Sequence, residues 1–245
     1  MMIDIMCVIN VLPFPQHELR DEMKNAVVVV IDVLRATTSI LEALQNGAYR
    51  IVPVSDPEQA MKLRAKYAPE PVLISGERAG LKIDGFDLGN SPVEFTEEVV
   101  SGKNVMICST NGTKAILYAS ASKTVYLACF RNLQAVVDKL RSATNDIYIV
   151  CSGKLDEFCM EDMACAGAIV ERLSATNRDY QLSDSAKTAR ILYLNYKNDL
   201  LRLMQESEHG QYLTSLGMAS DLDYCAQINV SPLVPQLVDG ILVQP

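Results

Sequence analysis

The chain has 245 residues, of which 49% are hydrophobic and 21% charged, so it is long and apolar enough to bury a sizeable core. Its net charge of -8 argues against nucleic acid and against an anionic membrane as partners, because both require a basic face. An anionic small molecule is compatible with this charge, provided that local basic residues or a divalent cation attract it.

The seven cysteines include no C-x-x-C pair, and several lie inside apolar runs, as Cys108 and Cys151 do. This pattern predicts reduced, buried thiols and fits a reducing cytosol. The N-terminus has an early Asp4 and no basic segment, unlike a signal peptide, and no apolar run approaches the roughly 20 residues that span a bilayer. We therefore expect a cytoplasmic protein.

Apolar, β-branched runs alternate with helical patterns along most of the chain. Strands are expected at residues 2–9, 25–32, 49–54, 71–75, 103–108, 124–128 and 146–151, with a strand-like tail near 226–242. Helices are expected at residues 37–46, 56–67, 92–101, 112–121, 131–142, 160–174, 184–205 and 207–216. This alternation predicts an α/β protein with a largely parallel sheet covered on both faces. No linker or repeat interrupts the pattern, so one domain over residues 1–245 is expected.

The segment from Ser75 to Asn90 combines glycines and many charges without any periodicity. An irregular loop of this length is uncommon inside a compact domain and is usually functional. It contains the adjacent Glu77 and Arg78. The Ser91–Glu94 string that follows it has the form of a capping box and predicts a helix start.

Polar clusters follow three of the expected strands. The strand at 25–32 ends in Asp32 and is followed by Arg35, Thr37 and Thr38. Loops after parallel strands meet at one edge of the sheet, and helix N-termini there offer free N–H groups to anions. The sequence therefore predicts one anion pocket, to which the other two clusters contribute Thr110, Asn111, Gly112, Thr113, Ser152 and Gly153.

Well-known phosphate motifs do not decide the chemistry. The chain has no G-x-x-x-x-G-K-[ST] string, no G-x-G-x-x-G after a strand and no G-x-S-x-G elbow. An aspartyl-phosphate enzyme would usually carry a second carboxylate two positions after its nucleophile, and after Asp32 that position is Leu34.

The strings VVIDVLRATTSI, GERAGLKIDGFDLGNSPVEF and STNGTKA, together with the FCMED and SEHGQYL segments, resemble the 2-phosphosulfolactate phosphatase family. The resemblance runs in order from about residue 3 to residue 240. It implies a three-layer α/β/α fold with a largely parallel or mixed sheet. It also implies a magnesium-dependent phosphatase that converts 2-phospho-3-sulfolactate to 3-sulfolactate and phosphate, a step towards coenzyme M.

Asp32, Arg35 and His209 are the expected catalytic residues. A planar guanidinium such as that of Arg35 suits phosphate or sulfonate better than an ammonium group does, and His209 is the better general-acid candidate of the two histidines. Simpler alternatives stay open. Asp32 could cap the next helix, Arg35 could pair with Asp32, and His209 could be structural.

Mg²⁺ usually takes one or two protein carboxylates together with water and phosphate oxygens. Its expected ligands are Asp32, Glu77, Glu161 and Asp162, although acids such as the last two also favour a helix start without any function. Thr37 and Thr38 are expected to bind substrate or to cap a helix. Arg78 or Lys82 is expected to bind the sulfonate.

Three questions are left open by the sequence. Asp32 could form a covalent phosphate intermediate or could activate water. The substrate could be another 2-hydroxy-acid phosphate, or the protein could bind such a metabolite without hydrolysing it, as a sensor. A homo-oligomer is also compatible with the sequence.

Overall fold

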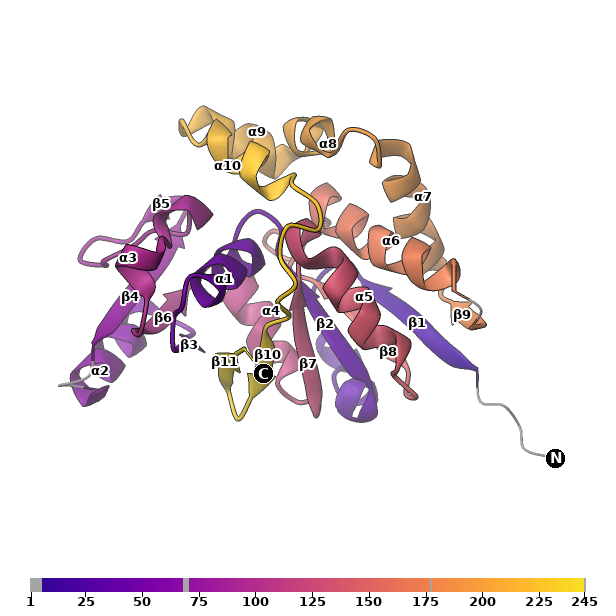
Figure 1. The fold of residues 1–245 in the computed structure, drawn as a ribbon, viewed down its shortest axis with the longest axis horizontal. Coiled ribbons are helices and arrows are strands. Elements are labelled where there is room, and N and C mark those ends of the chain that lie inside the picture. The colour runs from indigo at the N-terminus through magenta and orange to yellow at the C-terminus, as the bar shows by residue number, and fades with distance from the viewer. Residues whose placement is uncertain (1–5, 68–70, 177, 245) are drawn as a thin grey trace.

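A mixed β-sheet forms the centre of the molecule, which the computed structural model describes for residues 6–67, 71–176 and 178–244 (Figure 1). Eleven strands of these residues lie in the order β5-β4-β6-β3-β11-β10-β7-β2-β8-β1-β9. They are β1 Cys7–Leu12, β2 Val27–Ile31, β3 Arg50–Pro53, β4 Val72–Arg78, β5 Leu81–Lys82, β6 Asn104–Cys108, β7 Thr124–Ala128, β8 Ile147–Cys151, β9 Tyr180–Leu182, β10 Gln236–Val238 and β11 Ile241–Val243.

Helices cover both faces of this sheet. They are α1 Ala36–Gln45, α2 Pro57–Tyr67, α3 Glu97–Val100, α4 Gly112–Ala119, α5 Leu133–Arg141, α6 Met160–Ser174, α7 Asp184–Tyr196, α8 Leu200–Glu206, α9 Glu208–Ser215 and α10 Ala219–Cys225. The last three lie together at the top of the view in Figure 1. In the described ranges, none of the helices is long and apolar enough to cross a membrane.

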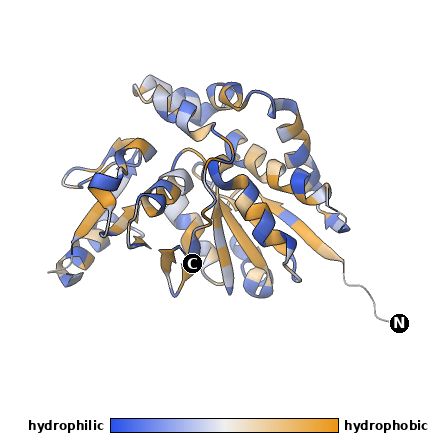
Figure 2. Cartoon of the chain, viewed as in Figure 1, coloured by the Kyte–Doolittle hydropathy of each residue, from blue (hydrophilic) through white to orange (hydrophobic). Residues whose placement is uncertain are grey.

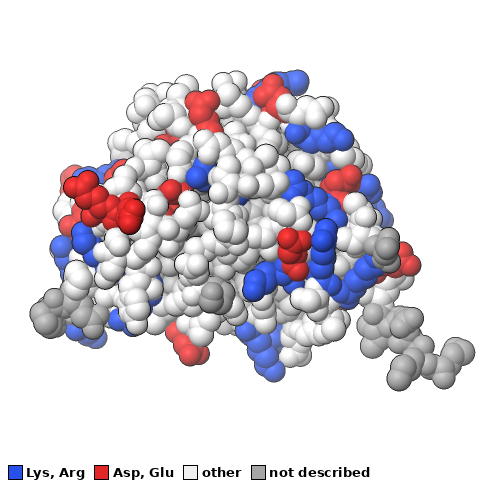
Figure 3. Space-filling model, in the orientation of Figure 1, with Lys and Arg blue, Asp and Glu red and all other residues white. Residues whose placement is uncertain are grey.

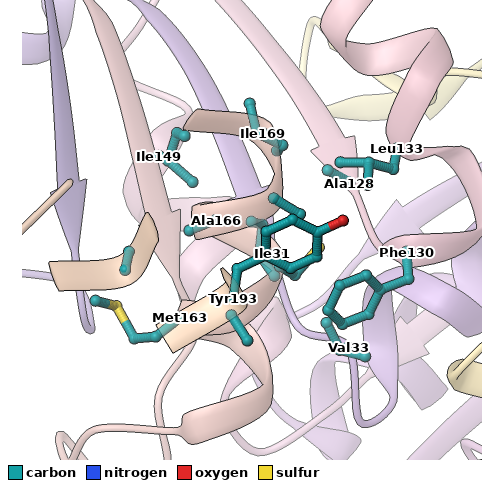
Figure 4. Close-up of a cluster of buried hydrophobic side chains, with 14 of the residues drawn as sticks. Ile31, Val33, Ala128, Phe130, Leu133, Ile149, Met163, Ala166, Ile169 and Tyr193 are labelled. Atoms are coloured by element: carbon teal, nitrogen blue, oxygen red, sulfur yellow. The ribbon is translucent and has the colours of Figure 1, made fainter. Parts of the chain in front are cut away.

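The central strand β2 shows why the fold has three layers. Val29 and Ile31 belong to a core shared with α5, α6 and α7, whereas Val28 and Val30 belong to a second core shared with α1 and α4. Figure 4 shows the first core around Ile31. Strands are therefore apolar on both faces, while the helices carry polar outer surfaces (Figure 2). The predicted α/β class is confirmed.

The sheet is mixed because the chain end enters its middle. β10 pairs with β7 and β11 pairs with β3, both antiparallel, so this hairpin separates two groups of parallel strands. The prediction of a strand-like tail near 226–242 is confirmed only for the residues of this hairpin, β10 and β11. Short antiparallel strands leave no strong periodic signal in a sequence.

Several predicted boundaries were wrong. The segment from Ser75 to Asn90 is not an irregular loop throughout, because β4 continues to Arg78 and turns into β5. The helix predicted at 92–101 is a 3-10 turn followed by α3, and that at 184–205 divides into α7 and α8 before Asp199, whose side chain caps α8. The strand predicted at 2–9 begins at Cys7, and its first residues lie outside the described part.

Charged groups of both signs occur on the face seen in Figure 3, separated by wide uncharged areas. Although the net charge is -8, the acidic side chains do not form one continuous patch on this face. Attraction of an anionic ligand has to come from local cations, as the composition predicted.

Candidate active site

A cavity of about 370 Å³ lies where β2, β4, β6 and β8 end and α9 covers them. Segments from all three predicted polar clusters reach it, and Asn111 Oδ1 accepts the N–H of Leu155 at 3.2 Å. Its lining consists of Asp32, Leu34, Arg35, Glu77, Ala79, Gly80, Asn90, Ser109, Thr110, Asn111, Lys154, Leu155, His209 and Tyr212. The clusters therefore converge at one edge of the sheet.

Asp32 lies at the end of β2 with 6% of its surface exposed. Its Oδ1 accepts the N–H of Ala36 at 3.1 Å, so it does cap the start of α1 as well as lining the cavity. Burial, reinforced by the charge of Glu77, raises the pKa of Asp32 to about 6 against the opposing effect of the Ala36 N–H. A carboxyl with this pKa can exchange a proton near neutral pH.

Gly112 lets α4 approach Asp32. A Cβ at this position would lie 2.4 Å from Asp32 Oδ2 and 2.5 Å from the Cβ of Ala36. Only a residue without a side chain therefore fits between α4 and α1 here. Gly112 does not itself line the cavity, and its contribution is to allow this close packing beside Asp32.

Arg35 is also buried, but its ion pair is not with Asp32. Nη1 donates to Asp221 Oδ2 at 2.8 Å and lies 2.8 Å from Met218 Sδ, and Nη2 donates to the carbonyl of Gly80 at 2.7 Å. The alternative of an Asp32–Arg35 pair is therefore wrong. No local pattern pointed to Asp221 as the partner of Arg35, because it lies 186 positions away in the chain.

A second, much smaller cavity of about 10 Å³ adjoins the first and contains three carboxylates, those of Asp32, Glu161 and Asp162. Asp162 accepts the N–H of Val33 at 2.8 Å and the hydroxyl of Ser152 at 3.0 Å. One oxygen of Glu161, Oε2, is buried without a hydrogen-bond partner. Three buried acids thus line one small space, and one of their oxygens is unpaired.

Burial and mutual repulsion oppose ionisation of these acids. Burial raises the pKa of Glu161 to about 7, and the charge of Asp32 adds to this effect. The pKa of Asp162 is raised well above its usual value by burial and by Glu161. A cation among them would remove the repulsion.

The donor set fits Mg²⁺. Residues 6–67, 71–176 and 178–244 contain no ready-made group of three or more His, Cys, Asp or Glu side chains that could hold a metal ion. Mg²⁺ does not require one, because it keeps several waters and takes few protein carboxylates. The small cavity has room for about one particle the size of the ion, and the adjoining larger cavity has room for its waters. The unpaired oxygen of Glu161 is a hard donor that lines the same small cavity as Asp32.

Glu77 differs from the other predicted metal ligands. Its two oxygens accept the N–H groups of Thr110 at 2.7 Å and Gly80 at 2.9 Å, and it lines only the larger cavity. It therefore fastens the end of β4 to the loop after β6. Unlike the three acids, Glu77 does not line the smaller cavity, although it lies close enough to Asp32 for its charge to raise the pKa of that residue.

His209 lines both cavities, and its Nδ1 is buried without a hydrogen-bond partner. Burial lowers the pKa of His209 to about 4, and the charges of Lys154 and Arg35 add to the effect. The imidazole is therefore neutral at neutral pH in the ligand-free protein. An anion beside Lys154 and Arg35 would oppose both charges and raise this pKa.

Several predicted substrate-binding residues do not line the larger cavity. The Thr37 hydroxyl lies 2.8 Å from the carbonyls of Asp32 and Ala128, and that of Thr38 donates to Val33. The Thr113 hydroxyl accepts the N–H of Ser109. These three hydroxyls hold the backbone behind the cavity wall. Ser152 and Gly153 line the smaller cavity instead.

The basic residues chosen for the sulfonate lie elsewhere. Arg78 is exposed, and its guanidinium donates to the Glu77 carbonyl and to Cys108 Sγ. Lys82 is exposed on β5. Neither lines the cavity. Lys154 lines it instead, with Nζ 5.3 Å from the ring centre of Tyr212.

Sequence reasoning missed other lining residues. Asn90 was not among the expected site residues, yet it lines the cavity and its Oδ1 is buried without a partner. Tyr212 enters from α9 and donates its hydroxyl to the Ala79 carbonyl at 2.9 Å. The Gly89–Asn90–Ser91 string and the position of Tyr212 close to His209 were the only signals available.

Comparison with known proteins gives a consistent result. A family model described as 2-phosphosulpholactate phosphatase matches residues 14–240. A probable 2-phosphosulfolactate phosphatase of Symbiobacterium thermophilum is 40% identical over 91% of this chain and 96% of its own length. Proteins of the same name from Caldanaerobacter subterraneus and Clostridium acetobutylicum are each 38% identical over 90% of this chain, and over 91% and 93% of their own lengths.

Proposed function

The chain belongs to the 2-phosphosulpholactate phosphatase family and is thus a phosphoric monoester hydrolase, and we propose that it uses Mg²⁺ to hydrolyse 2-phospho-3-sulfolactate to 3-sulfolactate and phosphate. The observation that carries the proposal is the convergence of Asp32, Arg35 and Lys154 on one cavity. A carboxylate and two cations at one site are what hydrolysis of a highly anionic ester requires.

Arg35 binds the phosphoryl group in this proposal. The described contacts use three of its five N–H groups, two on Nη1 and one on Nη2. The remaining two, on Nε and Nη2, can be donated to phosphate oxygens. Charge on those oxygens then meets a fixed, buried guanidinium, and burial strengthens the interaction.

Asp32 and Glu161 would hold the metal, with Asp162 oriented beside them by Val33 and Ser152. When bound, Mg²⁺ would offset the charge of the phosphate and would make a neighbouring water more acidic. This assignment is supported by the unpaired Glu161 oxygen and by the size of the small cavity.

Hydrolysis requires that a water oxygen bonds to phosphorus while the bond between phosphorus and the C2 oxygen breaks. The water proton passes to a base, for which Asp32 is the candidate because its carboxylate lines both cavities. The departing oxygen takes a proton and becomes the hydroxyl of sulfolactate. His209 lines the same cavity and is the proposed donor, because a bound phosphate raises its pKa.

Lys154 takes the sulfonate in this proposal. Among the residues that line the larger cavity, the basic ones are Arg35 and Lys154, apart from the neutral His209. With Arg35 engaged by phosphate, Lys154 is the cation left for the opposite end of the substrate. Such a contact would make the enzyme prefer phosphosulfolactate over phospholactate, which has no sulfonate.

Phosphate release from a panel of 2-phospho acids, measured with Mg²⁺ and with EDTA, tests the proposal. We expect turnover with Mg²⁺ that EDTA abolishes and that is fastest for phosphosulfolactate. Binding without turnover would instead indicate the sensor, and preference for a substrate without sulfonate would indicate a related phosphatase. The coenzyme M pathway, the cytoplasmic location, a homo-oligomer and the absence of nucleic acid partners stay predictions.

A further inference from the structure

A chain of buried polar contacts links the candidate cavity to the C-terminal helices. Asp221 on α10 accepts Arg35 Nη1 at 2.8 Å through Oδ2 and the hydroxyl of Ser91 at 2.6 Å through Oδ1. The side chains of Arg35 and Asp221 are each only 2% exposed. Two charges withdrawn from water to this extent interact far more strongly than a surface pair.

The geometry points to Asp221 as the positioning residue of the phosphoryl-binding guanidinium, an assignment that rests on the proposed function. Asp221 does not line the cavity, so it acts through Arg35 and not on the substrate. Arg35 has several rotatable bonds, and a long side chain in a cavity needs external contacts to present its donors in one direction.

The other contacts of Arg35 support this division. The Gly80 carbonyl holds Nη2 from the turn after β4, while Asp221 and Met218 hold Nη1 from the C-terminal segment. The guanidinium is thus fixed from two separate parts of the chain. Its Nε side, which carries the donors not used by these contacts, is left for an oxyanion.

Ser91 orients Asp221 in turn. Its hydroxyl has one proton to donate and gives it to Asp221 Oδ1, so that Oδ2 faces Arg35. Ser91 belongs to the capping box before the 3-10 turn, which fixes its backbone. The contact therefore anchors α10 on a rigid turn.

A double-mutant cycle tests the inference, with Arg35→Gln, Asp221→Asn and the combined variant. The amide keeps the size of Asp221 but removes its charge. We expect Asp221→Asn to lower kcat/KM for phosphosulfolactate about tenfold, and the combined variant to be no worse than Arg35→Gln alone, as for residues that act as a unit. Losses that multiply in the combined variant would overturn the assignment.

Binding of inorganic phosphate, followed by titration calorimetry, gives the same cycle without turnover. Asp221→Asn should weaken phosphate binding only when Arg35 is present. This readout separates the two proposals, because a wild-type protein that binds phosphate without hydrolysing any ester would contradict the proposed function and not the positioning role. Equal weakening in both backgrounds would contradict the positioning role.

Two further variants guard against a folding artefact. Asp223→Asn changes an exposed acid on the same helix and should leave kcat/KM and phosphate affinity unchanged. If Asp221→Asn does not fold, Ser91→Ala replaces it. It should lower kcat/KM a few-fold, and again only when Arg35 is present. Loss in the Arg35→Gln background as well would count against the inference.

Discussion

Gly112 at the start of α4 lies so close to Asp32 that a Cβ on the glycine would stand 2.4 Å from the carboxylate. The helix that follows one polar cluster is thus packed directly against the acid of another. This contact sets the position of Asp32 within the site, and it can be tested with a single methyl group.

Gly112→Ala should lower turnover at least roughly tenfold, because the added methyl displaces Asp32 from its position and small misplacements in an active site are costly. Alanine normally favours a helix over glycine by about 0.5–1 kcal/mol, so a lowered Tm would itself report the clash. Lys114→Ala, on the exposed side of α4, is the control and should behave as wild type. Wild-type kinetics for Gly112→Ala would show that Asp32 need not stay where it is.

Asp32→Asn should remove most turnover and leave the fold intact. The amide cannot accept the proton and is a weaker, uncharged ligand for a cation, yet it can still accept the N–H of Ala36. Because burial disfavours the charged form of Asp32, the neutral amide should not lower Tm. Phosphate release and thermal melting of the purified variant check both parts. A folded variant with wild-type rates would assign Asp32 to helix capping alone.

Glu161→Gln should raise the Tm of the protein in EDTA and abolish stabilisation by Mg²⁺. The pKa of Glu161 is raised to about 7. The pKa of a glutamate in the unfolded chain is about 4.3. Between about pH 4.3 and pH 7 the folded protein therefore binds more protons than the unfolded chain, and the free energy of unfolding falls as the pH rises. The gain from Gln should accordingly be small at pH 5 and a few °C at pH 8.

Glu157→Gln provides the matched control, since this acid is exposed on the neighbouring loop. Melting curves at pH 5 and pH 8, with Mg²⁺ and with EDTA, make the comparison. If Mg²⁺ stabilises Glu161→Gln as much as wild type, the metal does not use Glu161.

Lys154→Met should weaken phosphosulfolactate much more than phospholactate, because only the former carries the sulfonate that Lys154 is proposed to bind. The loss of one buried charge contact is typically worth a few kcal/mol, or about ten- to a thousandfold in kcat/KM. Arg78→Ala should affect both substrates equally and slightly, since Arg78 lies outside the cavity. Parallel losses for both substrates in Lys154→Met would assign Lys154 to the phosphate.

The sequence by itself determined the elements and the general position of the site. The run Val27–Ile31 is apolar at every position, and Asp32 follows where the strand ends. Both features are local, because strand periodicity and the polar residues after a strand depend on neighbours in the chain. The rule that parallel strands end at one edge then placed Asp32, Asn111 and Ser152 together.

Tertiary structure alone decided the partners of these residues. Arg35 pairs with Asp221, Glu77 accepts the N–H of Thr110, and Arg78 donates to Cys108 Sγ without lining the cavity. The antiparallel hairpin of β10 and β11 likewise enters the sheet from the far end of the chain. Each of these outcomes depends on which distant segments pack together. Distant segments are packed together by the burial of apolar surface across the whole fold, which no local pattern encodes.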